Sequence, residues 1–495
     1  GLPPFEDERG IHQVQSNRQY QVFHHKAFIF PYMGCYAATM LRDAGHEVMW
    51  LDGEAEGLTW PRFVASAIRF GPDFVAWEAK TPSIIRTWER VRELKIGLPD
   101  ATFVLYGDHV TALPEETLKE SEVDIAIIGG DYDFALLEIA KQYQTKTPVS
   151  KIHKWVYRPF KHNALIWNQP TDSSLNDLPI PDRTLVNWRL YAGTQGSGNY
   201  KYLPGTHTYF GRDCWWRKDG GCTFCSWTNT YKNFRCVSVD QAMAEVESCA
   251  SLGIREVFDD TGTFPPGKWM HAFCETMRKF NRGRRHGHCR LTMGCNLRPG
   301  YLKREEYRLL GEAGFRLVLF GLESANQPTL ERINKGQSDG DIGRSVKWAH
   351  EAGLDPHATC MVGYSFEDKA DAERTIELTR SLFRKGWLRT LQATICIPYP
   401  GTELYRQCLE NDWLKYQPGD WEQWDMTKPV MKTCMSDEEI LAMTRGIYKT
   451  CFTPSFVVRK LLSIRTLDDL RFIAKGARYI WGHLKDFSRP LNQSK

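Results

Sequence analysis

Three cysteines in one short stretch are the residues whose spacing most directly predicts chemistry. Seven residues separate Cys214 from Cys222, and Cys225 follows after two more. Three thiolates can bind three irons of a four-iron cluster and leave the fourth iron open to a substrate or cofactor, whereas an electron carrier uses four thiolates. We therefore expect a [4Fe–4S] cluster with one open iron at these cysteines.

Two other metal sites compete with this prediction. A structural zinc site needs four closed ligands and would have to recruit Cys236 or His207. An iron–sulfur electron carrier needs a fourth clustered cysteine, and none follows at the spacing of ferredoxins. The remaining cysteines are scattered without metal-ligand spacing, so we expect them to be small buried hydrophobic residues.

The pattern around the cysteines predicts the scaffold that positions them. Short β-branched or aromatic runs alternate with helical segments, which is typical of an α/β fold. The predicted strands are residues 206–210, 256–259, 288–293, 317–322, 358–362 and 391–397. Six such units predict a partial (β/α)6 barrel of the TIM type. The chemistry of such a barrel sits at the C-terminal ends of its strands, and Cys214 follows the first of them.

A second α/β pattern precedes the barrel. Its predicted strands are residues 25–30, 46–51, 73–77, 102–106 and 124–128, and its predicted helices are residues 37–44, 60–70, 84–96 and 115–120. This order predicts a doubly wound, Rossmann-like parallel sheet, on which ligands bind beyond the carboxyl ends of the strands. The loops at 107–111 and 129–132 begin with glycine, so a flat cofactor could approach their backbone.

These patterns divide the chain into four parts. Residues 1–145 are expected to form the N-terminal domain, and the proline-containing residues 146–205 a linker. Residues 206–402 are expected to form the barrel, and residues 403–495 a mostly helical C-terminal region.

The end of that C-terminal region is basic. Its cations are Arg459, Lys460, Arg465, Arg471, Lys475 and Arg478. Most such faces are solvated, and docking to a membrane or a protein is the less common use. Trp413, Trp421 and Trp424 could line a cavity under this region, although core packing is the commoner role of tryptophan.

Composition excludes several classes of protein. The chain has 495 residues, enough for two or three domains, and 64 Lys and Arg against 60 Asp and Glu give a net charge of only +4. Such a balance argues against nucleic-acid binding. No stretch is apolar enough for a membrane span, and the N-terminus does not resemble a secretory signal, so we expect a cytoplasmic protein with reduced thiols.

With these residues in place, the sequence resembles the radical S-adenosylmethionine (SAM) superfamily, and within it the cobalamin-dependent branch, over roughly residues 24–435. The superfamily signature is C-x3-C-x2-C with an aromatic residue before the third cysteine. Phe224 matches that aromatic position. The sequence departs from the signature in the longer spacing between Cys214 and Cys222.

The resemblance implies residues that contact SAM. The segment that begins at Phe258 places Asp259 and Asp260 where the family holds the SAM amino group. The segment that begins at Phe320 places Glu323 and Ser324 toward SAM.

The resemblance also implies a cobalamin site in the N-terminal domain. Its residues would be Gly107, Asp108, His109, Gly129 and Gly130. The domain lacks the D-x-H-x-x-G sequence that supplies a histidine to cobalt in some cobalamin proteins, so the lower cobalt ligand is unassigned. His109 could be that ligand, but a loop histidine that caps the next helix is the commoner case.

The implied function is that of a cobalamin-dependent radical SAM methyltransferase. It would use a 5′-deoxyadenosyl radical and methylcobalamin to methylate an unactivated carbon or a phosphinate phosphorus in a biosynthetic pathway. The substrate would be a small molecule bound between the domains, and the electrons would come from a donor such as flavodoxin or ferredoxin. The alternatives are a cobalamin-dependent cyclase or rearrangement enzyme without methyl transfer, a radical SAM enzyme without cobalamin, and a non-enzymatic cobalamin- or zinc-binding sensor.

Overall fold

A six-stranded parallel sheet forms the larger α/β unit. The computed structural model describes residues 1–5, 11–12, 22–23, 28–145, 164–167, 174–193, 199–283 and 290–488. The strands of this sheet are β7 (Gly205–Thr208), β10 (Glu256–Asp259), β11 (Thr292–Leu297), β12 (Phe315–Glu323), β13 (Asp355–Val362) and β14 (Thr390–Ile395). They pair in the order β14-β13-β12-β11-β10-β7. The predicted partial barrel is confirmed.

One barrel strand begins later than the sequence predicts. The prediction was 288–293, of which 288–289 lie outside the described residues, whereas β11 starts at Thr292 and continues to Leu297. Gly294, directly after the predicted end, lies within the strand. A Cβ on Gly294 would lie 2.8 Å from Cδ2 of Phe258 on β10, so glycine allows close strand packing here.

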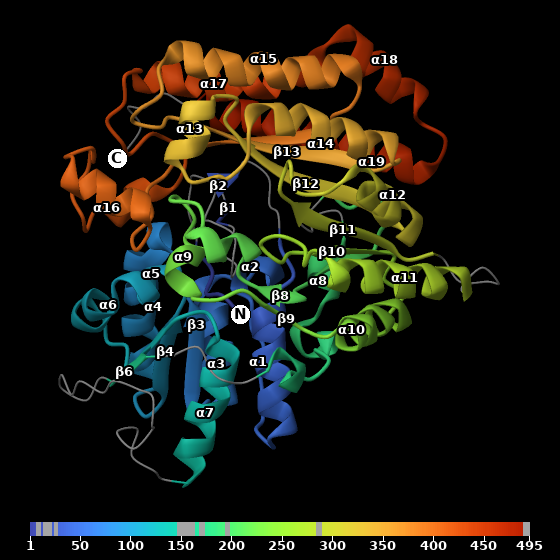
Figure 1. Cartoon of the computed structure of the whole chain (residues 1–495). Coiled ribbons are helices and arrows are strands. Elements are labelled where there is room, and N and C mark those ends of the chain that lie inside the picture. The colour runs from blue at the N-terminus through green and yellow to red at the C-terminus, as the bar shows by residue number, and fades with distance from the viewer. Residues whose placement is uncertain are drawn as a thin grey trace.

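Helices connect the barrel strands along its outer side (Figure 1). They are α10 (Val239–Ser251), α11 (Lys268–Gly283), α12 (Arg304–Ala313), α13 (Gln327–Arg332), α14 (Asp339–Glu351) and α15 (Lys369–Lys385). Ser338 and Asp368 begin α14 and α15 with capping boxes, in which each side chain accepts a hydrogen bond from the backbone three residues later. Local sequence therefore fixes where these helices start.

A four-stranded parallel sheet forms the N-terminal unit, which lies below the barrel in Figure 1. Its strands are β3 (Phe74–Glu78), β4 (Thr102–Tyr106), β5 (Ile125–Ile128) and β6 (Ala164–Trp167), paired in that order. The first three were predicted almost to the residue. β6 lies within residues 146–205, which we expected to be a linker; its four apolar residues extend the sheet beside β5.

The two earliest predicted strands are not strands in the structure. Residues 46–51 have no strand pairing, and Trp50 instead donates a hydrogen bond to the Tyr191 hydroxyl at 3.2 Å, while that hydroxyl donates to Asp52 at 2.7 Å. These contacts hold the segment against α8 (Arg189–Ala192). Of the predicted strand 25–30, residues 25–27 lie outside the described residues, and 28–30 form no regular strand.

Helices surround this N-terminal sheet. They are α1 (Tyr32–Asp43), α2 (Gly53–Glu56), α3 (Trp60–Phe70), α4 (Ile84–Gly97), α5 (Asp108–Ala112), α6 (Pro114–Glu120) and α7 (Tyr132–Thr145). α1 packs along α7. A separate pair of short strands, β1 (Ile11–His12) and β2 (Val22–Phe23), is antiparallel.

The C-terminal region is helical, as predicted. It contains α16 (Glu403–Glu410), α17 (Asp437–Lys449), α18 (Pro454–Leu462) and α19 (Leu467–Asp486). Trp421 and Trp424 are fully buried in the core and Trp413 packs against it, so core packing is confirmed for these tryptophans. None of the described helices is both long and apolar enough to cross a membrane.

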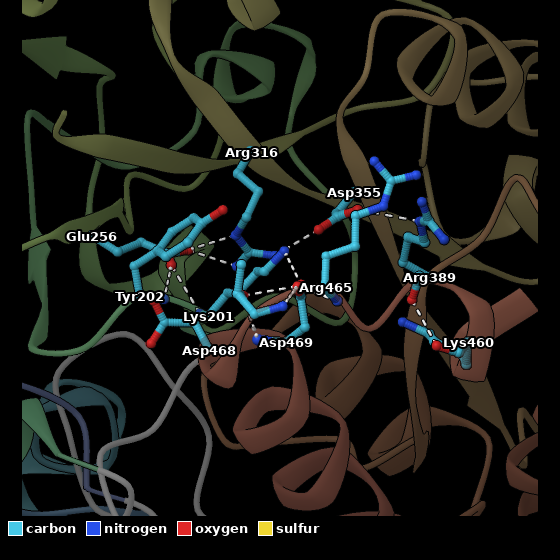
Figure 2. A network of polar contacts seen from close by, with 12 residues as sticks. Lys201, Tyr202, Glu256, Arg316, Asp355, Arg389, Lys460, Arg465, Asp468 and Asp469 are labelled. Atoms are coloured by element: carbon cyan, nitrogen blue, oxygen red, sulfur yellow. Dashed lines mark hydrogen bonds and ion pairs between the residues drawn. The ribbon is translucent and has the colours of Figure 1, made fainter. Parts of the chain in front are cut away.

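Ion pairs attach α19 to the N-terminal end of the barrel strands (Figure 2). Arg316 lies between Glu256 and Asp355, with N–O distances of 2.6 and 2.9 Å. Asp468 at the start of α19 pairs with Arg255 at 2.8 Å, and its neighbour Asp469 pairs with Lys201 at 2.5 Å. The network therefore closes the end of the barrel opposite the cysteines.

Candidate functional site

The three cysteines lie on the loop that follows the first barrel strand. The strand β8 (Gly211–Arg212) ends two residues before Cys214, and α9 (Trp227–Thr230) begins two residues after Cys225. Between them, Gly220 and Gly221 have φ angles of +92° and +76°, a conformation that allows the chain to reverse. The Cys225 backbone N–H donates to the Cys222 carbonyl at 3.1 Å, which closes a tight turn around the pair.

The chemistry of these thiols fits a cluster. Burial raises the pKa of Cys225 to about 12 and also raises the pKa of Cys214, and a charge on the neighbouring Cys222 would raise both pKa values further. Such buried thiols become thiolates only beside strong positive charge, which bound iron supplies. Arg298 adds a donor, with Nη1 3.6 Å from Sγ of Cys222.

A structural zinc site would need a fourth ligand beside the three cysteines. In the part of the chain that the structure describes, no group of three or more His, Cys, Asp or Glu side chains converges on a point that could hold one metal ion. A [4Fe–4S] cluster does not need three side chains at one point, because each of its three cysteines binds a different iron. Of the two residues that zinc could recruit, His207 is engaged elsewhere, because its ring lies 2.6 Å from the Tyr200 hydroxyl, and Cys236 lies in β9 (Arg235–Cys236).

The segment after α13 clamps the cysteine loop. Asn334 donates to the Gly221 carbonyl at 2.8 Å and accepts from the Trp216 indole at 2.8 Å. The Thr223 N–H donates to the Ile333 carbonyl at 3.0 Å. We did not single out Asn334 or Arg298 from the sequence. Asn334 lies in the segment that resembles the family's fourth strand, whereas Arg298 follows a strand whose end was predicted too early.

Asp259 and Asp260 lie at the C-terminal end of β10, and both are buried. Asp259 accepts hydrogen bonds from the Phe210 N–H and the Thr261 hydroxyl, both at 2.9 Å. Burial raises the pKa of Asp259 to about 8, so this carboxyl is mostly protonated at neutral pH. Asp260 accepts from the Asn296 amide at 3.2 Å.

Glu323 and Ser324 lie at the end of β12 but face different surroundings. Glu323 has φ of +62°, lines the barrel cavity and pairs with Lys335 at 2.7 Å. Ser324 is fully buried and donates to Glu367 at 2.6 Å, within a network that includes Asn326. The Ser324 hydroxyl is therefore already used inside the protein.

The predicted cobalamin residues cluster at the C-terminal edge of the N-terminal sheet. Gly107 has φ of +124°, and a Cβ there would lie 2.4 Å from the Ala79 carbonyl oxygen. Gly129 has φ of +97° and donates to the Thr111 hydroxyl at 3.1 Å. Asp108 is buried, 3.5 Å from the buried amine of Lys80. This edge thus combines two buried glycines in the left-handed backbone region with a buried ion pair.

His109 is fully buried at the start of α5. Its Nδ1 lies 3.2 Å from the Thr81 hydroxyl, and its ring meets Trp88 and Trp421 edge-on at 6.3 and 5.2 Å. Burial lowers the pKa of His109 to about 3, so the imidazole is neutral. Cobalt ligation by His109 stays a prediction.

The two sets of predicted residues meet across the domain interface. Asn229 of α9, four residues after Cys225, donates to the Asp108 carbonyl at 3.3 Å. The Tyr231 hydroxyl donates to the Gly130 carbonyl, also at 3.3 Å. The segment that follows the cysteine loop, α9 and Tyr231 after it, therefore contacts both predicted cobalamin loops.

A cavity of about 670 Å³ occupies the barrel interior. Phe224 of the cysteine loop, Glu323 and Tyr399 lie among the residues that line it near the C-terminal strand ends. Ile29 of the N-terminal unit also lines it, so both units contribute. Lys460 and Lys475 line it from α18 and α19, and the predicted solvated face is wrong for these two lysines.

Family models match two parts of the chain. Residues 208–379 match the radical SAM superfamily, and residues 29–135 match the B12 binding domain.

Two relatives match most of the chain in sequence. An uncharacterized methyltransferase, PH0819, of Pyrococcus horikoshii is 26% identical over 83% of this chain and 85% of its own. The anaerobic magnesium-protoporphyrin IX monomethyl ester cyclase of Rubrivivax gelatinosus is 23% identical over 84% of this chain and 72% of its own.

Solved structures share the fold. The radical SAM methyltransferase TsrM of Kitasatospora setae, solved with cobalamin and a [4Fe–4S] cluster, superposes with a TM-score of 0.64 at 16% identity, over 79% of this chain and 77% of its own. The cobalamin-dependent radical enzyme OxsB, solved with aqua-cobalamin and SAM, gives 0.64 at 11% identity, over 91% and 69%.

Proposed function

Because this chain is a radical SAM protein that carries a B12-binding domain, we propose that it is a cobalamin-dependent radical SAM methyltransferase acting on an unactivated carbon or a phosphinate phosphorus of a small molecule. Its cofactors are a [4Fe–4S] cluster, SAM and cobalamin, which together supply a 5′-deoxyadenosyl radical for hydrogen abstraction and a methyl group for transfer. Two relatives from Chlorobaculum tepidum, each 26% identical over part of the chain, are also named methyltransferases.

One observation carries the proposal. α9 begins two residues after Cys225; Asn229 of α9 and Tyr231 directly after it bond to Asp108 and Gly130 at the predicted cobalamin edge. The cysteine loop and the predicted cobalamin loops are thereby held next to each other, which supports a methyl transfer between cofactors and one substrate.

The protein's own residues have separate tasks in this proposal. Cys214, Cys222 and Cys225 would hold the cluster, and Phe224 beside them would exclude water from the adjoining cavity. Among the candidates for SAM binding, Glu323 has the most direct geometry because it is a carboxylate that lines the cavity. Asp260 would be a second polar contact.

The proposal is tested with the protein reconstituted anaerobically with iron, sulfide and hydroxocobalamin. We would add SAM with a deuterated methyl group and a strong reductant, and measure 5′-deoxyadenosine and S-adenosylhomocysteine by mass spectrometry. Wild type is expected to form both. Cys225→Ala should form no 5′-deoxyadenosine, whereas Cys236→Ala, which removes a cysteine outside the loop, should behave as wild type.

Two other outcomes of this experiment would lead to different conclusions. Release of 5′-deoxyadenosine without S-adenosylhomocysteine would favour the cyclase or rearrangement activity to which the Rubrivivax gelatinosus relative points. A fully iron-loaded protein that cleaves no SAM would contradict both the methyltransferase activity and the cyclase or rearrangement activity.

A further inference from the structure

The barrel cavity is long and follows the strands. On β12 its lining extends from Leu317 to Glu323, six residues apart, which corresponds to about 20 Å of strand. On β13, His357, Thr359 and Met361 line it in alternation, as residues on one face of a strand do. The cavity therefore runs from the cysteine loop toward the N-terminal end of the barrel.

The middle of the cavity is apolar. Its lining there comes from the strands, from α15 and from α19, namely Leu319, Phe258, Ile395, Phe383, Phe472 and Ile480. Such a lining favours a hydrocarbon chain because apolar surface is removed from water on both sides of the contact.

The charged side chains along the cavity lie at its two ends. Glu323 lies at the cysteine end, where Lys335 neutralises it at 2.7 Å. Arg389, Lys460 and Lys475 line the opposite end. The cavity thus has an apolar body and a positively charged end.

The network around that end leaves it positive. Asp355 is shared by Arg316 at 2.9 Å and Arg389 at 3.2 Å, and Glu256 pairs with Arg316. Figure 2 shows Lys460 on the side of Arg389, away from Glu256.

The two lysines are desolvated. Burial lowers the pKa of Lys460 to about 8, with Asp355 opposing that shift and Arg389, Arg316 and Lys201 adding to it. Burial also lowers the pKa of Lys475 to about 8, against the attraction of Glu256. Both amines stay mostly protonated at neutral pH, and an anion bound beside them would offset the cost of burying their charge.

The cavity opens beside exposed apolar side chains. Phe452, Val457 and Leu461 line it and are 55%, 41% and 60% exposed. An amphiphile could enter between these residues without passing through the polar network.

We propose that this cavity binds a substrate with a long apolar chain and a terminal anion, a carboxylate or a phosphate. The anion lies against Arg389, Lys460 and Lys475, and the chain extends toward Phe224 at the cysteine loop. The inference rests on the proposed function, because the reacting position is then an unactivated carbon in the chain.

The test measures binding to the reconstituted holoprotein by isothermal titration calorimetry. The probes are palmitate, hexadecyl phosphate and methyl palmitate, which has the chain without the charge, each below its aggregation concentration. We expect one of the anions to bind at least about 10-fold more tightly than methyl palmitate, and the tighter one identifies the head group.

Variants separate the lysines from the rest of the basic region. Lys460→Gln and Lys475→Gln should each weaken binding of the anion about 10-fold and leave methyl palmitate unchanged. Lys485→Gln removes an exposed charge of α19 outside the cavity lining and should bind the anion as wild type does.

Three results would overturn the inference: no binding of either anion, equal binding of methyl palmitate, or wild-type binding by the Lys460→Gln/Lys475→Gln double variant. Binding requires no cleavage of SAM. A protein that binds palmitate but forms no 5′-deoxyadenosine would overturn only the proposed function, and the reverse result only this inference.

Discussion

Asp259 lies at the end of β10 with no surface exposed to water. Burial raises its pKa to about 8, against about 3.9 for an aspartate in an unfolded chain. Between these values the folded protein keeps a proton that the unfolded chain has lost. Stability contributed by this group is therefore greatest at low pH and falls as pH rises through that window.

Replacing Asp259 with asparagine keeps an acceptor for the Phe210 N–H but removes the titration. Wild type is expected to lose about 1.4 kcal/mol of unfolding free energy per pH unit relative to Asp259→Asn between about pH 5 and 8. Anaerobic urea denaturation of both proteins across that range measures the difference. Parallel pH profiles would show that Asp259 ionises normally in the folded protein.

At the scale of elements, the cysteine loop depends on the segment that follows α13. Gly336 has φ of +62°, and a Cβ at this position would lie 2.0 Å from Cζ2 of Trp216. Trp216 in turn bonds to Asn334. Only glycine satisfies both the backbone conformation and this contact.

We expect Gly336→Ala to displace Trp216, to destabilise the protein by about 1–3 kcal/mol and to speed the loss of iron from the reconstituted cluster. Gly340→Ala, in the first turn of α14, is the matched control because the nearest atom to its new Cβ is 3.9 Å away. Iron content after timed exposure to a chelator tests both. Equal iron retention by the two variants would show that the contact between Gly336 and Trp216 does not help to retain the cluster.

At the scale of the molecule, Arg212 connects the two α/β units. It is fully buried and bonds to Asp131 at 2.5 Å and to Asp133 at 3.0 Å, both at the start of α7. Arg235 also reaches Asp131, at 2.6 Å. The predicted cobalamin edge is thereby held against the cysteine loop by buried charges.

Arg212→Met should cost about 3–5 kcal/mol, because Asp133 would lose its cation while buried. Hydrogen exchange should rise at the start of α7 and in α9, and the protein should retain less cobalamin after gel filtration. Arg278→Met, which breaks the exposed pair with Glu312, should change neither readout. Unchanged exchange in Arg212→Met would mean that apolar packing alone joins the units.

The spacing of the cysteines and the periodicity of apolar residues were enough to predict much of the molecule. The cysteine stretch, five of the six barrel strands and three strands of the N-terminal sheet follow from sequence, because burial of one face imposes a local repeat on each element. The sequence also predicted the helical C-terminal region, in which Ser436 and Thr466 cap α17 and α19.

Tertiary structure decided what depends on distant partners. β6 became a strand because β5 offered it an edge, and residues 46–51 did not because Tyr191, which itself donates to Asp52, binds the Trp50 indole. The proton on Asp259, the engagement of Ser324 by Glu367 and the place of Lys460 in the cavity wall all arise from contacts across the fold. The burial of a residue and the charges near it depend on side chains that are distant in sequence, so one stretch of sequence cannot predict them.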